Sequence, residues 1–329
     1  METLTEKKLT TTRGFTYTYC SHAASNGLPT ILLVHGWPDR ASLWEDLINN
    51  HLKPAGYGIV APDCLGYGAT DKPTDANAYV SRDLSADIVQ ILDTEGLESV
   101  VVLGHDWGSF LASRIYLFFP DRVKGLVLMN VAYRPPSEAP FDLDKFNPFM
   151  QSLLGYSPYW YWELVLSEQG PKILEDHLES LWTILHGDGD SMIGTFGTKD
   201  GMKTFLLESK TQAVQEYATE GRKVEFLRQF KEEGMTAPLC WYKAQAFNLH
   251  FEPELAVSKE LYAVQKPVLF IGGKHDKVGL TSGIYQSQKA GLLPNLSVTE
   301  VDAAHWVMLA KPKEVGDAVI NWLKTNYGS

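Results

Sequence analysis

The residues with the clearest chemical potential lie in Gly104-His105-Asp106-Trp107-Gly108, between the apolar run Val100–Leu103 and a helical pattern. Gly-x-Nuc-x-Gly between a strand and a helix is the nucleophile-elbow pattern, which presents its central side chain on a strained turn. Here Asp106 stands where a serine hydrolase has serine. When a carboxylate attacks a saturated carbon and displaces its leaving group, the product is an ester that water can cleave. A serine hydroxyl that attacked the same carbon would form an ether, which water does not cleave. The alternative is that Asp106 only caps the following helix.

A second motif follows the apolar run Ile31–Val34 and reads His35-Gly36-Trp37-Pro38-Asp39. A His-Gly-x-Pro turn at the end of a buried strand is where folds of this kind place an oxyanion-hole donor. We expect the backbone N–H groups of Trp37 and Trp107 to stabilise an oxyanion together. The Trp37–Pro38 bond is a candidate for the cis isomer, because tight functional turns often contain it. An ordinary Gly-Pro turn is the alternative.

An acid and then a histidine must follow the nucleophile in chain order. Asp276 follows the strand-like run Val268–Ile271, and His305 follows Leu296–Val301. Both positions correspond to the carboxyl edge of a parallel sheet, where ligands gather. We expect His305 to activate water and Asp276 to orient its imidazole.

Other readings of these positions stay open. His305 as a structural histidine and Asp276 as a helix cap are the alternatives, and His275 and Asp302 are the nearest rival pair. Asn130 follows another strand-like run, but an amide cannot act as the acid.

The elements that would position these residues alternate between strands and helices. Continuous apolar runs without alternation indicate strands covered on both faces, as in a parallel sheet. The expected strands are Ile31–Val34, Ile59–Ala61, Val100–Leu103, Leu126–Met129, Val268–Ile271 and Leu296–Val301. The expected helices are Tyr79–Glu95, Trp107–Phe119 and Pro312–Thr325. This order predicts an α/β fold with a mostly parallel sheet and helices on both faces.

The middle of the chain differs from the rest. It contains few strand-like runs, many aromatic residues and the helical patterns Pro171–Leu185 and Lys223–Glu233, whereas Gly187–Asp190 is typical of an irregular loop. We therefore predict core residues 1–133, an inserted helical cap at 134–247, and core residues 248–329. Seven cap aromatics suggest an apolar pocket: Phe141, Phe146, Phe149, Tyr156, Trp160, Trp162 and Trp182.

Composition narrows the class of protein. The 329 residues carry a net charge of −11, which argues against a nucleic-acid partner and against docking on an anionic membrane. Cys20, Cys64 and Cys240 form no CxxC pair, so a disulfide framework is not expected. The polar N-terminus lacks the apolar segment of a signal peptide, and no apolar run could span a membrane. We expect a cytoplasmic protein, either a monomer or a homodimer.

Taken together, the motifs resemble the epoxide hydrolases of the α/β-hydrolase superfamily over essentially the whole chain. The resemblance rests on His35-Gly36-Trp37-Pro38, Gly66-Tyr67-Gly68-Ala69-Thr70, the Gly104–Gly108 segment, Asp276 and His305. It implies a small apolar epoxide and water as reactants, with no cofactor and no metal.

The resemblance also implies two cap tyrosines that protonate the epoxide oxygen. The segment Leu239-Cys240-Trp241-Tyr242-Lys243 is similar to that of the second tyrosine, which identifies Tyr242. The first lies in Tyr159-Trp160-Tyr161-Trp162, where Tyr161 is our choice and Tyr159 the alternative. Either tyrosine could instead only pack within the cap.

Two alternative functions remain. Haloalkane dehalogenases share Asp-Trp at the elbow, but they commonly have Asn where Trp37 stands. A non-catalytic, ligand-binding relative would be expected to lack a member of the triad, and Asp106, Asp276 and His305 are all present.

Overall fold

The computed structural model describes residues 4–25 and 27–328. Within these residues eight strands form one sheet in the order β1-β2-β4-β3-β5-β6-β7-β8. The strands are β1 (Thr5–Thr10), β2 (Thr16–His22), β3 (Thr30–Val34), β4 (Gly58–Pro62), β5 (Val100–His105), β6 (Val123–Met129), β7 (Val268–Gly273) and β8 (Leu296–Val301). Neighbouring strands from β4 to β8 in this order are parallel, whereas β1 and β2 pair antiparallel.

Burial explains which strands the sequence reveals. Every residue of β3, β4, β5 and β7 is buried, as expected for apolar strands covered on both faces. In contrast, β1 is an edge strand whose side chains are exposed or half-buried, and it carries Lys7 and Lys8. Charged residues on an edge discourage pairing with another chain. The pairing of the strands confirms the predicted mostly parallel sheet. Strands β1 and β2 were not predicted and extend the sheet at one edge.

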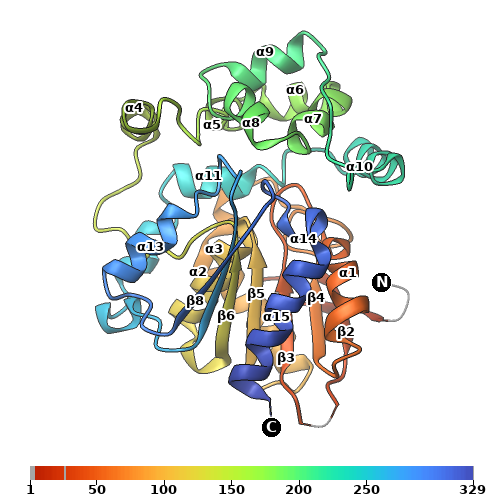
Figure 1. Cartoon of the computed structure of the whole chain (residues 1–329), viewed down its shortest axis with the longest axis vertical. Helices are drawn as coiled ribbons and strands as arrows, with labels where there is room; N and C mark the ends of the chain where they lie inside the picture. The colour runs from red at the N-terminus through yellow and green to blue at the C-terminus, as the bar shows by residue number, and fades with distance from the viewer. Residues whose placement is uncertain (1–3, 26, 329) are drawn as a thin grey trace.

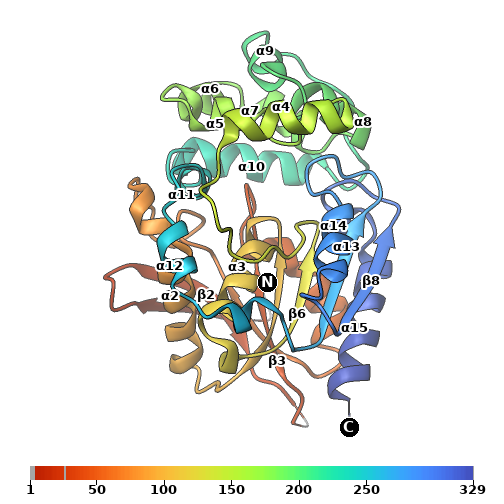
Figure 2. The ribbon, with the colours of Figure 1, turned by 90° about the vertical axis from the view of Figure 1, so that its left-hand side faces the viewer.

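Helices cover both faces of the sheet (Figures 1 and 2). One face carries α1 and α15, and the other carries α2 and α3. The helices of this part are α1 (Glu45–Leu47), α2 (Ser81–Thr94), α3 (Trp107–Phe118), α13 (Ser282–Lys289), α14 (Val307–Ala310) and α15 (Pro312–Tyr327). Shorter helical turns are η1 (Ala41–Trp44), η2 (Ile48–Leu52), η3 (Ala76–Tyr79), η4 (Pro120–Arg122) and η5 (Lys259–Tyr262).

The chain leaves the sheet after β6 and returns with β7, and the segment between is helical. Its helices are α4 (Leu143–Leu154), α5 (Trp162–Leu166), α6 (Gly170–Asp176), α7 (Leu178–Leu185), α8 (Gly189–Thr195), α9 (Gly201–Leu207), α10 (Glu220–Glu233), α11 (Cys240–Ala246) and α12 (Phe251–Leu255). Helices α4 to α9 lie above one edge of the sheet, and α10 and α11 lie below them, closer to the sheet (Figures 1 and 2). The division at residues 134 and 248 remains a prediction.

Two expectations for the helical segment were wrong. The single helix predicted over 171–185 is two helices, α6 and α7, because His177 has φ −127° and interrupts the helical backbone. The loop predicted at Gly187–Asp190 contains the start of α8, where Asp188 accepts a hydrogen bond from the backbone N–H of Ser191. Asp is a favoured residue for capping a helix N-terminus.

Over the described part of the chain, no helix combines the length and apolar character that crossing a bilayer requires.

Candidate active site

Asp106 lies at the sharp turn between β5 and α3, with φ 54° and ψ −123°. Such backbone conformations cost a non-glycine residue of order 1–3 kcal/mol and persist where the surroundings enforce them. Gly104 permits the turn, since a Cβ there would lie 2.2 Å from the carbonyl oxygen of Gly108. The Asp106 side chain makes no capping hydrogen bond to α3. The helix-cap alternative for Asp106 therefore does not describe the structure.

The carboxylate of Asp106 faces the His-Gly-Trp-Pro turn instead. The backbone N–H of Trp37 donates a 2.9 Å hydrogen bond to its Oδ1. A Cβ on Gly36 would lie 2.4 Å from Asp106 Oδ1 and 2.7 Å from the backbone nitrogen of Trp107. The turn and the elbow are thus packed so closely that only glycine fits at position 36. The predicted cis Trp37–Pro38 peptide bond is confirmed.

His305 lies between two carboxylates. Its Nδ1 is 2.7 Å from Asp276 Oδ2, and its Nε2 is 3.7 Å from Asp106 Oδ2. Asp276 is held in turn by the backbone N–H groups of Val278 and Gly279, each 2.9 Å from its Oδ1. The structure therefore brings together the three residues that the sequence predicts as nucleophile, acid and base, with His305 between Asp106 and Asp276.

The charges of these residues reinforce one another. Burial disfavours a charged His305, but the carboxylates of Asp276 and Asp106 outweigh it and raise the pKa of His305 to about 10. Burial alone would raise the pKa of Asp276. The charge of His305 and the hydrogen bonds from His305 and two backbone amides outweigh burial and lower this pKa to about 2. The pair Asp276–His305 is therefore ionic in the resting protein.

Residues that sequence reasoning did not assign also support the site. Asn130 has φ 65°, and its Nδ2 donates a 2.8 Å hydrogen bond to Asp276 Oδ2. The indole of Trp306 donates a 2.9 Å hydrogen bond to Asp39 Oδ2, which ties the turn that follows β3 to the loop that carries His305. Burial raises the pKa of Asp39 to about 7, and the nearby charge of Asp106 adds to this effect. The available signal was the position of Asp39, directly after Pro38 in the motif.

The rival pair lies elsewhere. His275 Nε2 is 2.7 Å from Asp302 Oδ1, and both side chains are more than half exposed. They pair with each other on the surface and do not reach the Asp106 carboxylate through any hydrogen bond among the described residues.

The two predicted tyrosines meet above the site. Tyr242 on α11 and Tyr161 just before α5 are buried, and their hydroxyl oxygens are 3.4 Å apart. Burial raises the pKa of both phenols, with Asp106 adding to the effect on Tyr161 and Tyr161 to that on Tyr242. Both hydroxyls therefore keep their protons. Tyr159 instead stacks on Trp162, with ring centroids 4.7 Å apart.

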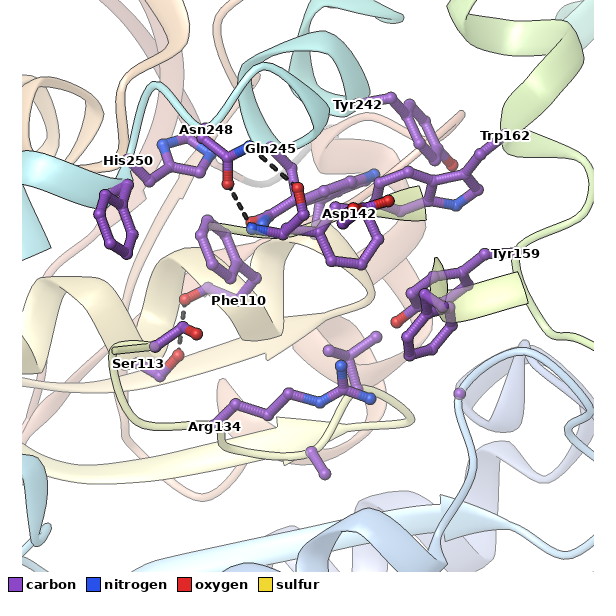
Figure 3. A pocket seen from close by; sticks show the side chains of 18 of the residues that line it. Phe110, Ser113, Arg134, Asp142, Tyr159, Trp162, Tyr242, Gln245, Asn248 and His250 are labelled. Atoms are coloured by element: carbon purple, nitrogen blue, oxygen red, sulfur yellow. Dashed lines mark hydrogen bonds between the residues drawn. The ribbon is translucent and has the colours of Figure 1, made fainter. Parts of the chain in front are cut away.

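A cavity of about 710 Å³ connects these groups to the surface (Figure 3). Asp106, Tyr161 and Tyr242 line it together with many aromatic side chains. Four of the seven predicted cap aromatics belong to the lining: Phe141, Phe146, Phe149 and Trp162. Of the others, Trp182 packs on His186 and Phe226 away from this cavity. The site is thus a pocket that combines aromatic side chains with polar groups, and Asp106 is one of these polar groups.

Comparison with known proteins agrees with this architecture. Residues 29–312 match the alpha/beta hydrolase fold family. The chain is 27% identical to epoxide hydrolase A of Mycobacterium tuberculosis over 308 residues, which cover 92% of each protein. It is 26% identical to bifunctional epoxide hydrolase 2 of Sus scrofa over 306 residues, and this match spans 91% of the chain but only 52% of the pig protein.

Solved structures extend the comparison. An epoxide hydrolase from an endophytic Streptomyces superposes with a TM-score of 0.82 at 25% identity, covering 98% of this chain and 96% of the other. Epoxide hydrolase A from Mycobacterium thermoresistibile superposes with a TM-score of 0.78 at 25% identity, covering 98% of each chain. With the family match over most of its length, this chain belongs to the alpha/beta hydrolase fold family.

Proposed function

We propose that this protein hydrolyses epoxides to vicinal diols through an ester formed on Asp106. The observation that carries the proposal is the arrangement around one carboxylate. Asp106 Oδ1 accepts from the Trp37 amide at 2.9 Å, while Oδ2 lies 3.7 Å from the His305 imidazole. A pair of protonated tyrosines lines the same pocket. The names of the similar proteins point to the same reaction.

The first step joins the substrate to the protein. An oxygen of Asp106 attacks a ring carbon, the ring C–O bond breaks, and the ring oxygen takes a proton from the Tyr161–Tyr242 pair. Hydrogen-bond donors of this kind typically contribute 10²–10⁴-fold to the rate of a step that involves proton transfer. The product of this step is a hydroxyalkyl ester of Asp106.

The second step releases the diol. Ester formation removes the charge of Asp106, so His305 gives up the proton that it carries at rest, which restores the tyrosine pair. The neutral imidazole then takes a proton from water, and the resulting hydroxide attacks Cγ of Asp106. The amides of Trp37 and Trp107 stabilise the oxyanion, a contribution of about 3 kcal/mol per donor in well-studied sites. The ester C–O bond at Cγ then breaks, the proton of the new Asp106 carboxyl group passes to the leaving oxygen, and the diol leaves with one original oxygen of Asp106. Asp276 orients His305 and balances its charge.

Isotope labelling tests this sequence. After many turnovers of styrene oxide in oxygen-18 water, Asp106 should contain the label, because each cycle replaces one carboxylate oxygen with a water oxygen. The control is the same incubation without epoxide, which should leave Asp106 unlabelled. Diol formation with an unlabelled Asp106 would contradict the ester. Halide release from a bromoalkane, with no diol from any epoxide, would favour dehalogenation, and turnover of neither would favour a binding protein.

A further inference from the structure

The pocket changes character from its base to its rim. At its base Asp106 is only 8% exposed, whereas Arg134, Ser137 and Lys145 line the same cavity and are exposed. These polar residues are therefore the part of the lining that is open to solvent. The rim is where a polar group at the far end of a substrate would lie.

Aromatic side chains make up much of the remaining lining. Trp107 and Trp162 are buried, and Phe110 and Phe141 are half-buried. A wall of this kind favours an apolar chain, and it offers little to a second charge.

Three cationic side chains line the cavity, and two of them are already paired. Arg114 donates two 2.9 Å hydrogen bonds to the carboxylate of Glu254. Lys145 lies 2.7 Å from Asp142. In the described parts of the chain, no carboxylate forms an ion pair with Arg134. Arg134 is therefore the lining cation whose charge is still available to a ligand.

The backbone of Arg134 is held in place while its side chain reaches into the pocket. Nη1 of Arg114 donates a 2.8 Å hydrogen bond to the Arg134 carbonyl oxygen. Pro135 and Pro136 follow, and their rings restrict the backbone at this point. Figure 3 shows the Arg134 side chain extended among the residues that line the cavity. The guanidinium thus has a fixed origin at the rim, which limits the space that it can reach.

We propose that Arg134 binds a carboxylate at the far end of an epoxide substrate whose ring lies at Asp106 and whose apolar chain lies between. This inference rests on the proposed function and adds the substrate class to it. A guanidinium binds a carboxylate through two parallel hydrogen bonds. The negative charge of Asp106 repels an anion at the base, so the carboxylate must be separated from the ring by enough chain to reach the rim.

The test compares ω-epoxyalkanoates of increasing chain length with the corresponding ω-epoxyalkanamides. We expect a preference in kcat/KM for the carboxylate of about fivefold, appearing only beyond a minimum chain length and decreasing at high salt. Arg134→Gln should remove this preference through KM while leaving the amides unchanged, and Arg134→Lys should restore part of it. Arg82→Gln, which removes an exposed arginine on α2, is the matched control and should keep the preference.

Binding of a non-reactive probe separates this proposal from the proposed function. 8-Phenyloctanoate should bind more tightly than 8-phenyloctanamide to the wild-type protein, and equally to Arg134→Gln. If the probe behaves in this way but no epoxide is hydrolysed, the carboxylate subsite stands and the proposed reaction fails. The subsite proposal is overturned if Arg134→Gln retains the carboxylate preference. Loss of the preference in Lys145→Gln would then assign the carboxylate to Lys145.

Discussion

The backbone N–H of Trp37 donates a 2.9 Å hydrogen bond to Oδ1 of Asp106, although 69 positions separate the two residues. This contact joins the turn after β3 to the turn after β5, two strands that are adjacent and parallel in the sheet. It also places a donor directly at the carboxylate that we propose as the nucleophile. Five predictions concern this arrangement and its surroundings, each with its own measurement.

Gly36→Ala should disable the site with little change elsewhere. The added Cβ would lie 2.4 Å from Asp106 Oδ1, so the turn must move away and the Trp37 amide with it. Loss of one oxyanion donor typically costs 10²–10³-fold in kcat, and we expect a loss of at least about 100-fold. Steady-state kinetics on styrene oxide measures it. Gly194→Ala is the matched control, because a Cβ there meets nothing within 4 Å. Near wild-type kcat for Gly36→Ala would mean that the close approach is unimportant.

Tyr242→Phe and Tyr161→Phe should each slow ring opening more than ester hydrolysis. Their hydroxyls are buried, protonated and 3.4 Å apart, so removing either one weakens the donor pair. We expect a loss of about 100-fold in the rate of ester formation. Rapid-mixing single-turnover experiments, followed by tryptophan fluorescence, separate the two steps. Tyr159→Phe decides between the two candidate residues: an equal loss there, with Tyr161→Phe active, would transfer the role to Tyr159.

The pKa of His305 should fall when Asp106 loses its charge. The carboxylates of Asp276 and Asp106 together raise this pKa to about 10, so Asp106→Asn removes one of the two causes. Formation of the ester removes the same charge, which frees the imidazole to accept a proton from water. An NMR titration of His305 in the wild type and in Asp106→Asn measures the change. An unchanged pKa would show that Asp106 has no electrostatic influence on His305.

The same shift makes stability depend on pH. The folded pKa of His305 lies above its unfolded value of 6.5, so its stabilising contribution is complete below pH 6.5 and is lost as pH rises through about 10. His305→Gln should therefore flatten the decline in the free energy of unfolding over this window. Urea denaturation at several pH values measures it. A decline as steep in His305→Gln as in the wild type would assign it to other groups.

Arg114 and Glu254 should matter for folding through their buried ion pair. Their side chains are 8% and 7% exposed, so Glu254→Gln leaves a buried guanidinium without its counter-charge. We expect a loss of about 3 kcal/mol in the free energy of unfolding, measured by urea denaturation. The control is Asp317→Asn, which breaks the exposed pair with Lys313 on α15 and should have little effect. Equal losses in both variants would show that burial does not matter here.

The sequence predicted the elements whose signal is local. Strands β3 and β5 were evident because each contains a continuous apolar run, Ile31–Val34 in β3 and Val100–Leu103 in β5, and the elbow has a short motif. The edge strand β1 was not predicted because its lysines and threonines form neither an apolar run nor a regular alternation of apolar and polar residues. Likewise, no pattern marks the break at His177, where the backbone alone interrupts a sequence suited to one continuous helix.

In the candidate site, too, only the residues marked by a local sequence pattern could be predicted. Asp106, Asp276 and His305 could be predicted because each lies within a short turn after the end of a strand, and strand ends meet at one edge of a parallel sheet. The contact between Trp306 and Asp39 joins residues 267 positions apart, and no local sequence pattern predicts it. The positions of Tyr159 and Tyr161 relative to Tyr242 likewise come only from the fold.

The most direct test of the account is the mass of the protein after exposure to an epoxide. In His305→Gln, ester formation can proceed while its hydrolysis is blocked, so brief incubation with styrene oxide should add the mass of one substrate molecule. Peptide mapping should place this mass on the peptide that contains Asp106, and Asp106→Asn/His305→Gln should show none. Diol production by His305→Gln without an adduct, or an adduct on another residue, would contradict the central claim.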